Sequence, residues 1–549
     1  MQIPYSKLPG FNEFFNDYIS DFNSLKDFFN YNYSDKENIF KSIVDKEENY
    51  SGRKLFSRSE LADILMIQNK FFNASDAAIN NIELLRNDNT FAVVTGQQAG
   101  ILTGNLYTIV KAVNSYQLAR KLSADFPDYN FVPVFWLEAD DHDFLEINNI
   151  NVFDRENKLA KLEYFPNGIP QEKYLAPVNS VNLDDYIEKF KTDLSDTLLK
   201  TDFSESVFDF INRSYKPGIS FPIAFARFLN YLLGELGIVF CNPADKEIKK
   251  LLIPVFEKEL NTYPETCERV IETSAVIEQK YEPQVKPQPI NVFYNHNGHR
   301  HLIEPRPENI FALKNSRQKF EKPQLIEQLY TAPENFSGNV ILRPICQDYL
   351  LPTIAYVAGP SEIAYFGQFK SVYKFYEVNM PVIYPRVSVT LLENRVSKFL
   401  DSNSLTIEEL FDEKKITSKF INKINELKVD DIFNNLKDEL NALYYSFGID
   451  LEKIDRNLLN TFRNKNEKYI ESLDFLREKF LESQIQQNET SINKLKSAIQ
   501  NVFPDEVLQE RFINVVYYIN KYSTRILQKI VESMEIDNFN HQVIEISSQ

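Results

Sequence analysis

The sequence predicts an α/β fold in which a parallel sheet, covered by helices on both faces, is followed by an α-helical coiled coil. Short apolar runs alternate with helical patterns over most of the chain, and buried parallel strands have this apolar character. Two polar, mixed segments, residues 151–202 and 276–334, interrupt the alternation and are expected to be insertions. Residues 395–504 contain one glycine and carry apolar residues in steps of three and four, as coiled coils do.

The composition limits the classes of function. The 549 residues exceed one hydrophobic core, and a net charge of −17 leaves no basic face for a nucleic acid. The first residues lack the pattern of a signal peptide, and no window of about 18 uncharged apolar residues offers a membrane span. The three cysteines lack metal-binding spacing. We therefore expect a cytoplasmic protein without a membrane or nucleic-acid partner.

The first part of the core, residues 1–150, holds the first candidate site. The apolar run FAVVT (91–95) predicts a buried strand, the loop GQQAGILTG (96–104) follows, and helical spacing begins near Asn105. A loop from a strand into a helix directs backbone N–H groups towards an anion, although a purely structural turn fits the position equally well. The candidate ligand-binding residues are Thr95, Gly96, Gln97, Gln98, Gly100, Gly104 and Asn105.

A charged cluster follows the second predicted strand, FVPVFWL (131–137). A carboxylate beside an imidazole orients it for acid or base catalysis, so we predict His142 as catalytic, with Asp141 and Asp143 orienting its ring. Asp140 is predicted to bind a ligand. Two alternatives stay open: coordination of Mg²⁺ around a phosphate, and a solvated cluster that caps a helix. Carboxyl ends of parallel strands share one edge, so we expect this cluster and the glycine loop in one cleft.

Three more apolar runs complete the predicted sheet, in the second and third parts of the core (203–275 and 335–394). A glycine turn opens a helix after the second run, and arginines lie near the strand ends. Arginine clamps a carboxylate or phosphate. The alternatives are an acid that complements the helix dipole and a surface ion pair. The runs are 237–241, 353–358 and 381–385, and the candidate binding residues are Arg343, Gly359, Ser361, Glu362, Arg386 and Ser388.

The insertions and the helical part carry structural signals. Asn297-Gly298 between extended flanks predicts a hairpin, and the three histidines beside it are expected to be exposed rather than metal ligands. In residues 395–504, a seam that includes Phe462 and Asn466 predicts a long helix or a helical hairpin. The C-terminal segment, 505–549, contains an amphipathic stretch and is expected to pack back on the core.

Four motifs occur in one order along the chain: VVTGQQAGILTGNLYTIVKA (93–112), PVFWLEADDHDFLEIN (133–148), RPICQDYLLPTIAYVAGPSEIAYFGQ (343–368) and PVIYPRVSVTLLE (381–393). They resemble the BshC family of bacillithiol biosynthesis, which usually has Glu where this chain has Asp140. The resemblance implies a nucleotidyltransferase-like Rossmann core with two connecting-peptide insertions. It also implies a coiled coil that joins two subunits as a homodimer.

The resemblance further implies the last step of bacillithiol synthesis, in which cysteine is joined to the amine of glucosaminyl-malate. Amide formation in water requires an activated carboxylate, an amine that has lost a proton, and donors that neutralise the developing charge. We therefore expect ATP or another nucleotide as activator, with Mg²⁺ as its companion, and predict no resident metal. Two other functions stay open: a nucleotide- or sugar-binding scaffold that uses its coiled coil for assembly, and an α/β enzyme that transfers phosphate.

Overall fold

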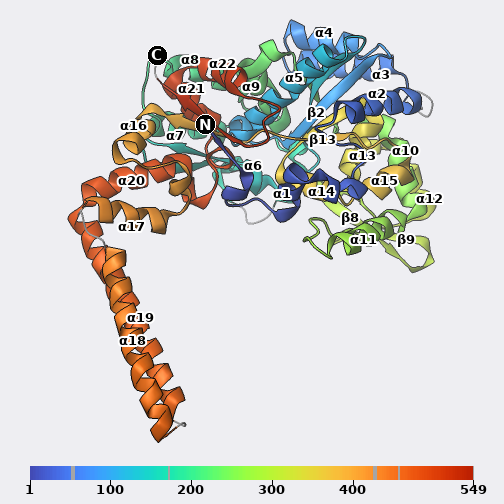
Figure 1. Ribbon diagram of the computed structural model, residues 1–549. Coiled ribbons are helices and arrows are strands. Elements are labelled where there is room, and N and C mark those ends of the chain that lie inside the picture. Colours follow the sequence, from blue (N-terminus) through green and yellow to red (C-terminus); the bar gives the residue numbers. More distant parts are fainter. Residues whose placement is uncertain (51–55, 171–173, 425–428, 456–457, 548–549) are drawn as a thin grey trace. The chain divides into compact units, whose positions relative to one another are not determined.

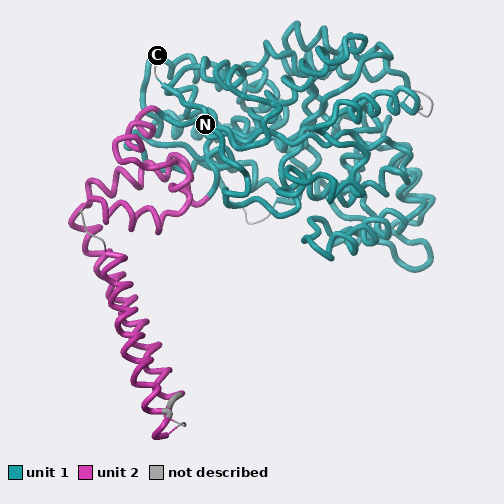
Figure 2. The backbone as a smooth tube through the Cα atoms, in the orientation of Figure 1, with its two compact units in different colours: residues 1–393, 507–549 teal, residues 394–506 magenta. Residues whose placement is uncertain are grey.

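The structure, a computed structural model, describes residues 1–50, 56–170, 174–424, 429–455 and 458–547. Two compact units divide the chain (Figure 2). The first contains residues 1–393 together with 507–549, and the second contains residues 394–506. The C-terminal segment therefore belongs to the same unit as the N-terminal core.

A five-stranded parallel sheet forms the centre of the first unit (Figure 1). Neighbouring strands all pair in parallel, in the order β13-β12-β2-β3-β6. Its side chains are almost wholly buried, as in a parallel sheet covered on both faces. The predicted Rossmann-like sheet is confirmed. The strands are β2 (Thr90–Gln98), β3 (Asn130–Glu138), β6 (Val239–Cys241), β12 (Thr353–Ala358) and β13 (Val382–Pro385).

The register of β2 against β3 aligns the ends of these two strands. The pairing extends to Gln98 opposite Glu138, so both strands end at the same level. The predicted boundary is wrong in one respect, because Gly96 belongs to β2 rather than to the following loop. A Cβ atom at position 96 would lie 3.1 Å from the carbonyl oxygen of Trp136, and glycine therefore permits the close approach of the two strands.

Helices surround the sheet and complete the first unit. Helix α5 packs along β2 and β3, and α3 packs against β6. Ser57 caps α3 as its sequence pattern predicts, because its hydroxyl accepts from the backbone N–H of Glu60 at 3.1 Å. Within the described ranges, no helix has the length and apolar character that a membrane span requires. The helices are α1 (Glu13–Ser20), α2 (Lys36–Tyr50), α3 (Arg58–Phe71), α4 (Asp76–Leu84), α5 (Tyr107–Asp125), α6 (Phe144–Ile147), α7 (Tyr186–Thr197), α8 (Ser204–Ser214), α9 (Phe221–Leu233), α10 (Lys246–Thr262), α11 (Glu265–Ile277), α12 (Lys322–Thr331), α13 (Leu342–Leu350), α14 (Pro360–Phe366), α15 (Lys370–Tyr376), α21 (Val515–Tyr522) and α22 (Arg525–Ser533).

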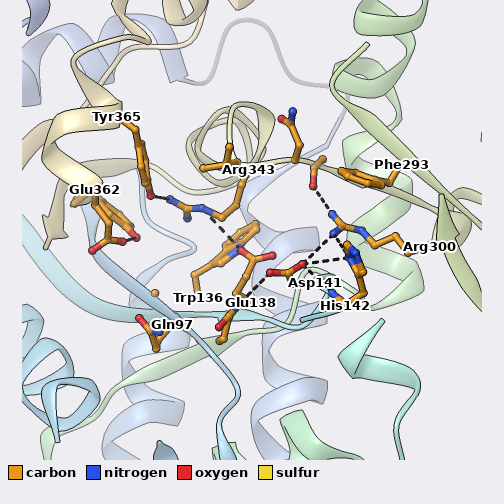
Figure 3. Close-up of a pocket in the computed structure, with 16 residues that line it drawn as sticks. Gln97, Trp136, Glu138, Asp141, His142, Phe293, Arg300, Arg343, Glu362 and Tyr365 are labelled. Carbon is orange, nitrogen blue, oxygen red and sulfur yellow. Dashed lines mark hydrogen bonds and ion pairs between the residues drawn. The ribbon is translucent and has the colours of Figure 1, made fainter. Parts of the chain in front are cut away.

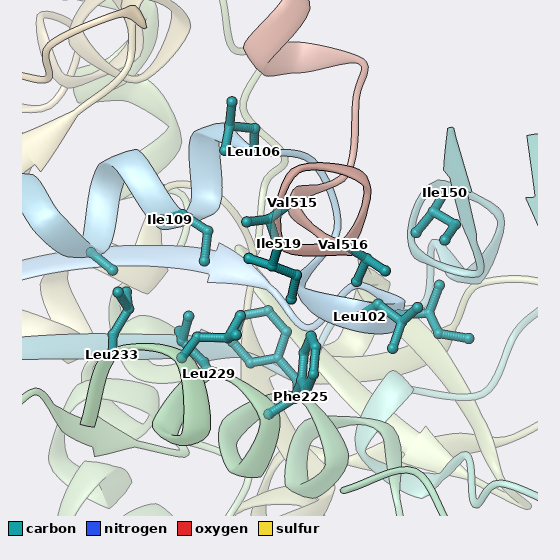
Figure 4. Close-up of a cluster of buried hydrophobic side chains, with 14 of the residues drawn as sticks. Leu102, Leu106, Ile109, Ile150, Phe225, Leu229, Leu233, Val515, Val516 and Ile519 are labelled. Atoms are coloured by element: carbon teal, nitrogen blue, oxygen red, sulfur yellow. The ribbon is translucent and has the colours of Figure 1, made fainter. Parts of the chain in front are cut away.

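Helices α5, α9 and α21 share a buried apolar cluster (Figure 4). Ile109 from α5, Phe225 from α9 and Ile519 from α21 are fully buried in it. Phe225 also packs on Phe135 of β3, with ring centroids 5.7 Å apart. Helix α21 belongs to the C-terminal segment, so burial of its apolar face holds this segment against the core. Such burial stabilises the fold by about 25 cal/mol for each Å² of apolar surface removed from water.

A second, antiparallel sheet has the order β10-β9-β8-β7-β11. Asn297 and Gly298 form the turn between β7 and β8, both with positive φ, and the predicted hairpin is confirmed. His299 is exposed as expected, whereas His296 and His301 are half-buried. The strands are β7 (Val292–His296), β8 (His299–Arg306), β9 (Ile310–Leu313), β10 (Lys319–Glu321) and β11 (Phe336–Gly338).

The C-terminal segment adds a strand to a third sheet. Strand β15 (His541–Ile546) pairs in parallel with β14 (Val389–Glu393) and antiparallel with β1 (Gln2–Ile3). A separate hairpin joins β4 (Asn149–Phe153) to β5 (Leu159–Glu163). The first and last residues of the chain therefore meet in one sheet of the first unit.

The second unit contains an antiparallel helical hairpin, α18 with α19. Arg477 of α19 forms an ion pair with Asp430 of α18, and Nδ2 of Asn466 donates to Oδ1 of Asn441 at 2.9 Å. The sequence left a long helix and a helical hairpin open, and the structure shows the hairpin. The helices of this unit are α16 (Asn394–Asn403), α17 (Glu413–Ile424), α18 (Val429–Ile454), α19 (Leu458–Gln487) and α20 (Glu489–Val502).

Candidate functional site

A cavity of about 370 Å³ lies at the carboxyl ends of β2, β3 and β12 (Figure 3). Strands β7 and β8 of the second sheet contribute Phe293 and Arg300 to it, and α13 and α14 contribute further side chains. Ligands of open parallel sheets bind at this edge. The lining residues are Gly96, Gln97, Gln98, Trp136, Glu138, Asp141, His142, Phe293, Arg300, Gly338, Asn339, Val340, Arg343, Tyr356, Glu362 and Tyr365.

Asp141 and His142 form a cluster with Arg300. Oδ1 of Asp141 lies 3.2 Å from Nη1 of Arg300 and 3.4 Å from Nδ1 of His142. Gln98 donates to the other carboxylate oxygen of Asp141 at 2.8 Å. Burial raises the pKa of Asp141, but its hydrogen bond with His142 and the charge of Arg300 outweigh burial and hold the pKa well below its ordinary range. Asp141 is therefore a fixed anion beside the imidazole.

The guanidinium group of Arg300 is held in one orientation by the second sheet. Nε donates to Oγ of Ser337 at 3.0 Å, and Nη2 donates to the carbonyl oxygen of Gly338 at 2.9 Å. The ring of Phe293 lies under the guanidinium carbon, with its centroid 3.9 Å away. This positive charge is thus fixed before a ligand arrives, which lowers the ordering cost of binding an anion.

Glu138 ends β3 and lies in the cavity beside Arg343. Nε1 of Trp136 donates to its Oε2 at 3.3 Å, and Nε of Arg343 lies 3.9 Å from the same oxygen. Burial, together with the negative charges of Asp140 and Asp141, raises the pKa of Glu138 to about 7 against the opposing charges of Arg343 and Arg300. A carboxyl group that titrates near neutral pH can accept and release protons in catalysis.

Arg343 is also held in place by neighbouring side chains. Nη1 donates to Oε1 of Gln347 at 3.1 Å, and Nη2 donates to the hydroxyl oxygen of Tyr365 at 3.2 Å. The guanidinium carbon lies 5.2 Å from the ring centroid of Tyr356. The cavity therefore contains two rigid guanidinium groups, on α13 and on β8.

A buried ion pair joins α5 to α14 next to the cavity. Nζ of Lys111 lies 2.6 Å from Oε2 of Glu362 and donates to the carbonyl oxygen of Gly96 at 3.0 Å. Burial lowers the pKa of Lys111, and the charge of Glu362 opposes that shift. Glu362 also accepts from the backbone N–H of Gly359 at 2.6 Å. The start of α14 is therefore capped by the protein's own carboxylate, which accepts from the backbone N–H of Gly359, and ligand binding by Gly359 stays a prediction.

The structure brings together part of the predicted site. The predicted residues that line the cavity are Gly96, Gln97, Gln98, Asp141, His142, Arg343 and Glu362. Both strand-end motifs thus reach one cleft, as predicted. Asp140 instead pairs with the buried Lys249 at 2.5 Å. Asp143 is exposed and, among the described residues, forms no hydrogen bond with His142, so its predicted orienting role is wrong.

The second half of the glycine loop, from Gly100 to Gly104, lies against the C-terminal segment, whereas Gly96, Gln97 and Gln98 line the cavity. The backbone N–H of Leu106, just before α5, donates to the carbonyl oxygen of Ile513 at 2.9 Å. The C-terminal segment therefore occupies this end of the helix, and anion binding by Gly100, Gly104 and Asn105 stays a prediction. Gly104 serves the turn itself, since its φ of 67° lies in the region that favours glycine.

The other predicted binding residues also lie outside the cavity lining. Nη2 of Arg386 lies 2.6 Å from Oε1 of Glu510, and the hydroxyl of Ser388 donates to the same oxygen at 2.8 Å. Thr95 is buried and donates to a carbonyl oxygen of β12 at 3.0 Å. Ser361 is exposed on α14. Tertiary partners thus occupy the polar groups of Arg386, Ser388 and Thr95, and ligand contacts of all four residues stay predictions.

Sequence reasoning missed Glu138, Trp136, Phe293, Arg300 and Lys111. The sequence did contain a signal for Arg300, because it lies between His299 and His301 on a predicted strand. Side chains alternate between the two faces of a strand, so Arg300 is expected on the face opposite to the two histidines. Glu138 had a weaker one, since it directly ends an apolar strand. No local signal pairs Lys111 with its partner, because the two residues are far apart in the sequence.

The charges of the cavity suit an anionic ligand and proton transfer. It combines a fixed carboxylate, a carboxyl group that titrates near neutral pH and two rigid guanidinium groups. In the part of the chain that the structure describes, no three His, Cys, Asp or Glu side chains gather to hold a metal ion. The Asp–His cluster is instead occupied by Arg300 and Gln98.

Comparison with known proteins identifies the family. The models of the BshC N-terminal Rossmann-like domain and C-terminal coiled-coil domain match residues 1–387 and 389–546. A protein of Salinibacter ruber named "Putative cysteine ligase BshC" is 33% identical over 98% of this chain and 97% of its own length. Proteins of the same name from Chloroherpeton thalassium and Bacillus cytotoxicus are 32% and 30% identical, over 97% and 96% of this chain and 96% and 97% of their own lengths. Because the two models together span nearly all of its residues, the chain belongs to the BshC family of bacillithiol biosynthesis.

Proposed function

We propose that the protein is a ligase that joins the carboxyl group of cysteine to the amine of glucosaminyl-malate, the last step of bacillithiol synthesis. The cavity at the carboxyl edge of the parallel sheet is the proposed site. The observation that carries the proposal is the pairing, in a BshC-family chain, of two rigid guanidinium groups with a carboxyl group of pKa about 7.

The chemistry of amide formation assigns tasks to these groups. Arg300 and Arg343 would hold substrate carboxylates and neutralise the negative charge that develops on the attacked carbonyl. The amine must lose a proton before or during its attack, and Glu138 and His142 are cavity groups that can accept one. Asp141 stays ionised and beside His142, so its proposed role is to position the ring.

Activation of the cysteine carboxylate by ATP or another nucleotide is part of the proposal. The nucleotide would supply the phosphoryl or adenylyl group that turns the carboxylate into an acyl donor. The guanidinium groups of Arg300 and Arg343 suit its phosphate oxygens. The N-terminal ends of α5 and α14 are less suited to bind phosphate oxygens. At these ends, the carbonyl oxygen of Ile513 and the carboxylate of Glu362 already accept from backbone N–H groups. Mg²⁺ would arrive with the nucleotide, bound chiefly by phosphate and water, and we assign it no protein ligand.

We also propose that two copies of the chain associate through the α18–α19 hairpin. Leu443, Phe447 and Leu476 on this hairpin are 65%, 58% and 55% exposed. Large apolar side chains at such exposure favour a partner surface, and a second hairpin offers one of matching character.

Product formation by the purified protein tests the proposed reaction. Cysteine and glucosaminyl-malate are incubated with the protein, with and without ATP and Mg²⁺, and the amide is detected by mass spectrometry. Arg343→Met should abolish the product, whereas Arg306→Met, on the exposed part of β8, should preserve it. Nucleotide consumption that does not depend on cysteine would support phosphate transfer instead and would overturn the proposal.

A further inference from the structure

The carboxyl group of Glu138 is placed as a reacting group. Its side chain is 21% exposed and lines the cavity. Among the described residues, Nε1 of Trp136 donates to its Oε2 at 3.3 Å, and no donor reaches Oε1. Glu362, a second carboxylate of the cavity, is by contrast fully engaged, because it accepts from Tyr356, from a backbone N–H and from Lys111. Glu138 is thus left with an oxygen for a ligand.

Asp141 and His142, the other two titratable groups of the cluster, already have partners within it. Asp141 is held as an anion by its partners, of which Arg300 is charged. Nδ1 of His142 lies 3.3 Å from Nη1 of the same arginine and 3.4 Å from Oδ1 of Asp141, so this ring nitrogen already has partners within the cluster. The side chain of His142 is also 36% exposed and therefore better solvated than Glu138.

The surroundings of Glu138 set its affinity for a proton. Its pKa is raised to about 7: burial is the largest cause, the positive charges of Arg343 and Arg300 oppose the rise, and the negative charges of two aspartates add to it. These aspartates are themselves paired, Asp140 with Lys249 and Asp141 with Arg300. The ionisable groups that act on or face Glu138 are Arg343 and Cys346 of α13, Tyr365 of α14, Arg300 of β8, and Asp140 and Asp141 after β3.

We propose that Glu138 is the catalytic base that takes the proton from the attacking amine during amide formation. The inference rests on the proposed function and names the acceptor of the proton within it. The amine nitrogen attacks the carboxyl carbon of cysteine, activated as an acyl phosphate or acyl adenylate, and a C–N bond forms. The C–O bond to the leaving phosphate or nucleotide breaks, and its electron pair departs with that group. The N–H proton passes to Oε1 of Glu138 and later to water.

The equilibrium for this proton transfer favours Glu138 over an ordinary glutamate. A primary amine of the α-amino type has a pKa of about 8 and an unperturbed glutamate one of about 4.3. Transfer to a group of pKa about 7 is uphill by a factor of about 10, whereas transfer to an unperturbed glutamate is uphill by a factor of about 5,000. A carboxylate that remained fully ionised, such as Asp141, would be a weaker base still.

Glu138→Gln is the direct test, because the amide resembles the protonated carboxyl group in shape. Arg343 keeps its bonds to Gln347 and Tyr365 in this variant, so the fold should persist. The matched control is Glu163→Gln on β5, whose carboxylate is 41% exposed and pairs with a surface lysine. Circular dichroism, recorded at rest and during urea unfolding, establishes that both variants are folded. Turnover is then measured between pH 5 and 9, a range of about two units on either side of neutrality.

The wild type and Glu163→Gln should gain activity as the pH rises through about 7, because the base must be ionised. The turnover of Glu138→Gln should be about 10²- to 10⁴-fold lower than that of the wild type, without the limb of rising activity through about pH 7. Arg343→Gln, which removes a charge that lowers the pKa of Glu138, should move the limb of its residual activity to higher pH. His142→Ala should keep the limb in place.

A second readout separates this inference from the proposed function. The infrared carboxyl band of Glu138, isolated as the difference between wild type and Glu138→Gln, should titrate near pH 7 even without substrates. Titration near pH 4–5, about the ordinary value, overturns the inference. An active Glu138→Gln variant beside an active wild type overturns it as well and leaves the proposed function standing. A wild type that binds both substrates and forms no amide overturns the proposed function.

Discussion

Replacing Arg386 by Met tests whether this arginine stabilises the fold or binds a substrate. Its side chain is 3% exposed, and Nη2 lies 2.6 Å from the fully buried carboxylate of Glu510. Removing one partner of a buried pair costs about 3–5 kcal/mol. Glu510 keeps the hydroxyl of Ser388 at 2.8 Å and the backbone N–H of Val389 at 2.9 Å as donors. We therefore expect the lower end, a loss of about 3 kcal/mol in the free energy of unfolding.

The chain offers a matched control for this substitution. Arg306 forms an ion pair with Glu304 at the same distance, 2.6 Å, but the two side chains are 53% and 28% exposed. Exposed pairs contribute about 0–1 kcal/mol, so Arg306→Met should change stability little. Urea unfolding followed by the emission of Trp136, the sole tryptophan, reports on the first unit. A loss below about 1 kcal/mol in Arg386→Met, with a raised KM, would refute the structural role.

The pH dependence of this difference gives a further check. Burial raises the pKa of Glu510, but the charge and hydrogen bond of Arg386 outweigh burial and lower it. A lowered pKa stabilises the fold above the unfolded value, about 4.3 for glutamate, and that contribution is lost as the pH falls through the folded pKa. The difference in the free energy of unfolding between the wild type and Arg386→Met should therefore become smaller below about pH 4.

Three further outcomes are expected. Gly104→Ala should lose about 1–3 kcal/mol in urea unfolding, since φ 67° with ψ −145° suits glycine alone, and an unchanged variant would contradict this assignment. Light scattering on the wild type should give twice the chain mass of 64.2 kDa, whereas the double variant Leu443→Glu/Leu476→Glu should give the mass of one chain; a monomeric wild type would refute the dimer. Asp141→Asn should melt below the wild type at pH 7, and the difference in melting temperature should begin to narrow as the pH falls below about 3.9, the unfolded value, and be lost as the pH falls through the lower folded pKa; a constant difference would show that ionisation is not its cause.

The sheet could be predicted because burial leaves a direct trace in the sequence. Strands covered on both faces are runs of apolar residues, and parallel pairing brings their carboxyl ends to one edge. Gln98 and Asp141, more than forty residues apart, were placed in one cleft by this reasoning, and they share a hydrogen bond of 2.8 Å. The hairpin at Asn297 followed from turn chemistry in the same way.

The local sequence could not show where a distant segment takes the polar groups of a motif. The start of α5 looks open to an anion in the sequence, but Ile513 supplies its acceptor from the far end of the chain. Arg386 looked like a clamp for a ligand and finds Glu510 instead. Glu138 was not predicted as a site residue, because its surroundings are made by distant segments. They include Arg343 and the β7–β8 hairpin, whose positions in space the local sequence does not show.

The central claim is that the substrates bind in the cavity beside Trp136, which is 2% exposed and lines it. The most direct test is a titration of the intact protein with glucosaminyl-malate, followed by the emission of this tryptophan. A saturable change is expected, weaker with glucosamine, which lacks the malate carboxylates, and much weaker in Arg343→Met than in Arg306→Met. A preparation that forms the amide while its emission stays constant at saturating substrate would contradict the account and place the reaction elsewhere in the molecule.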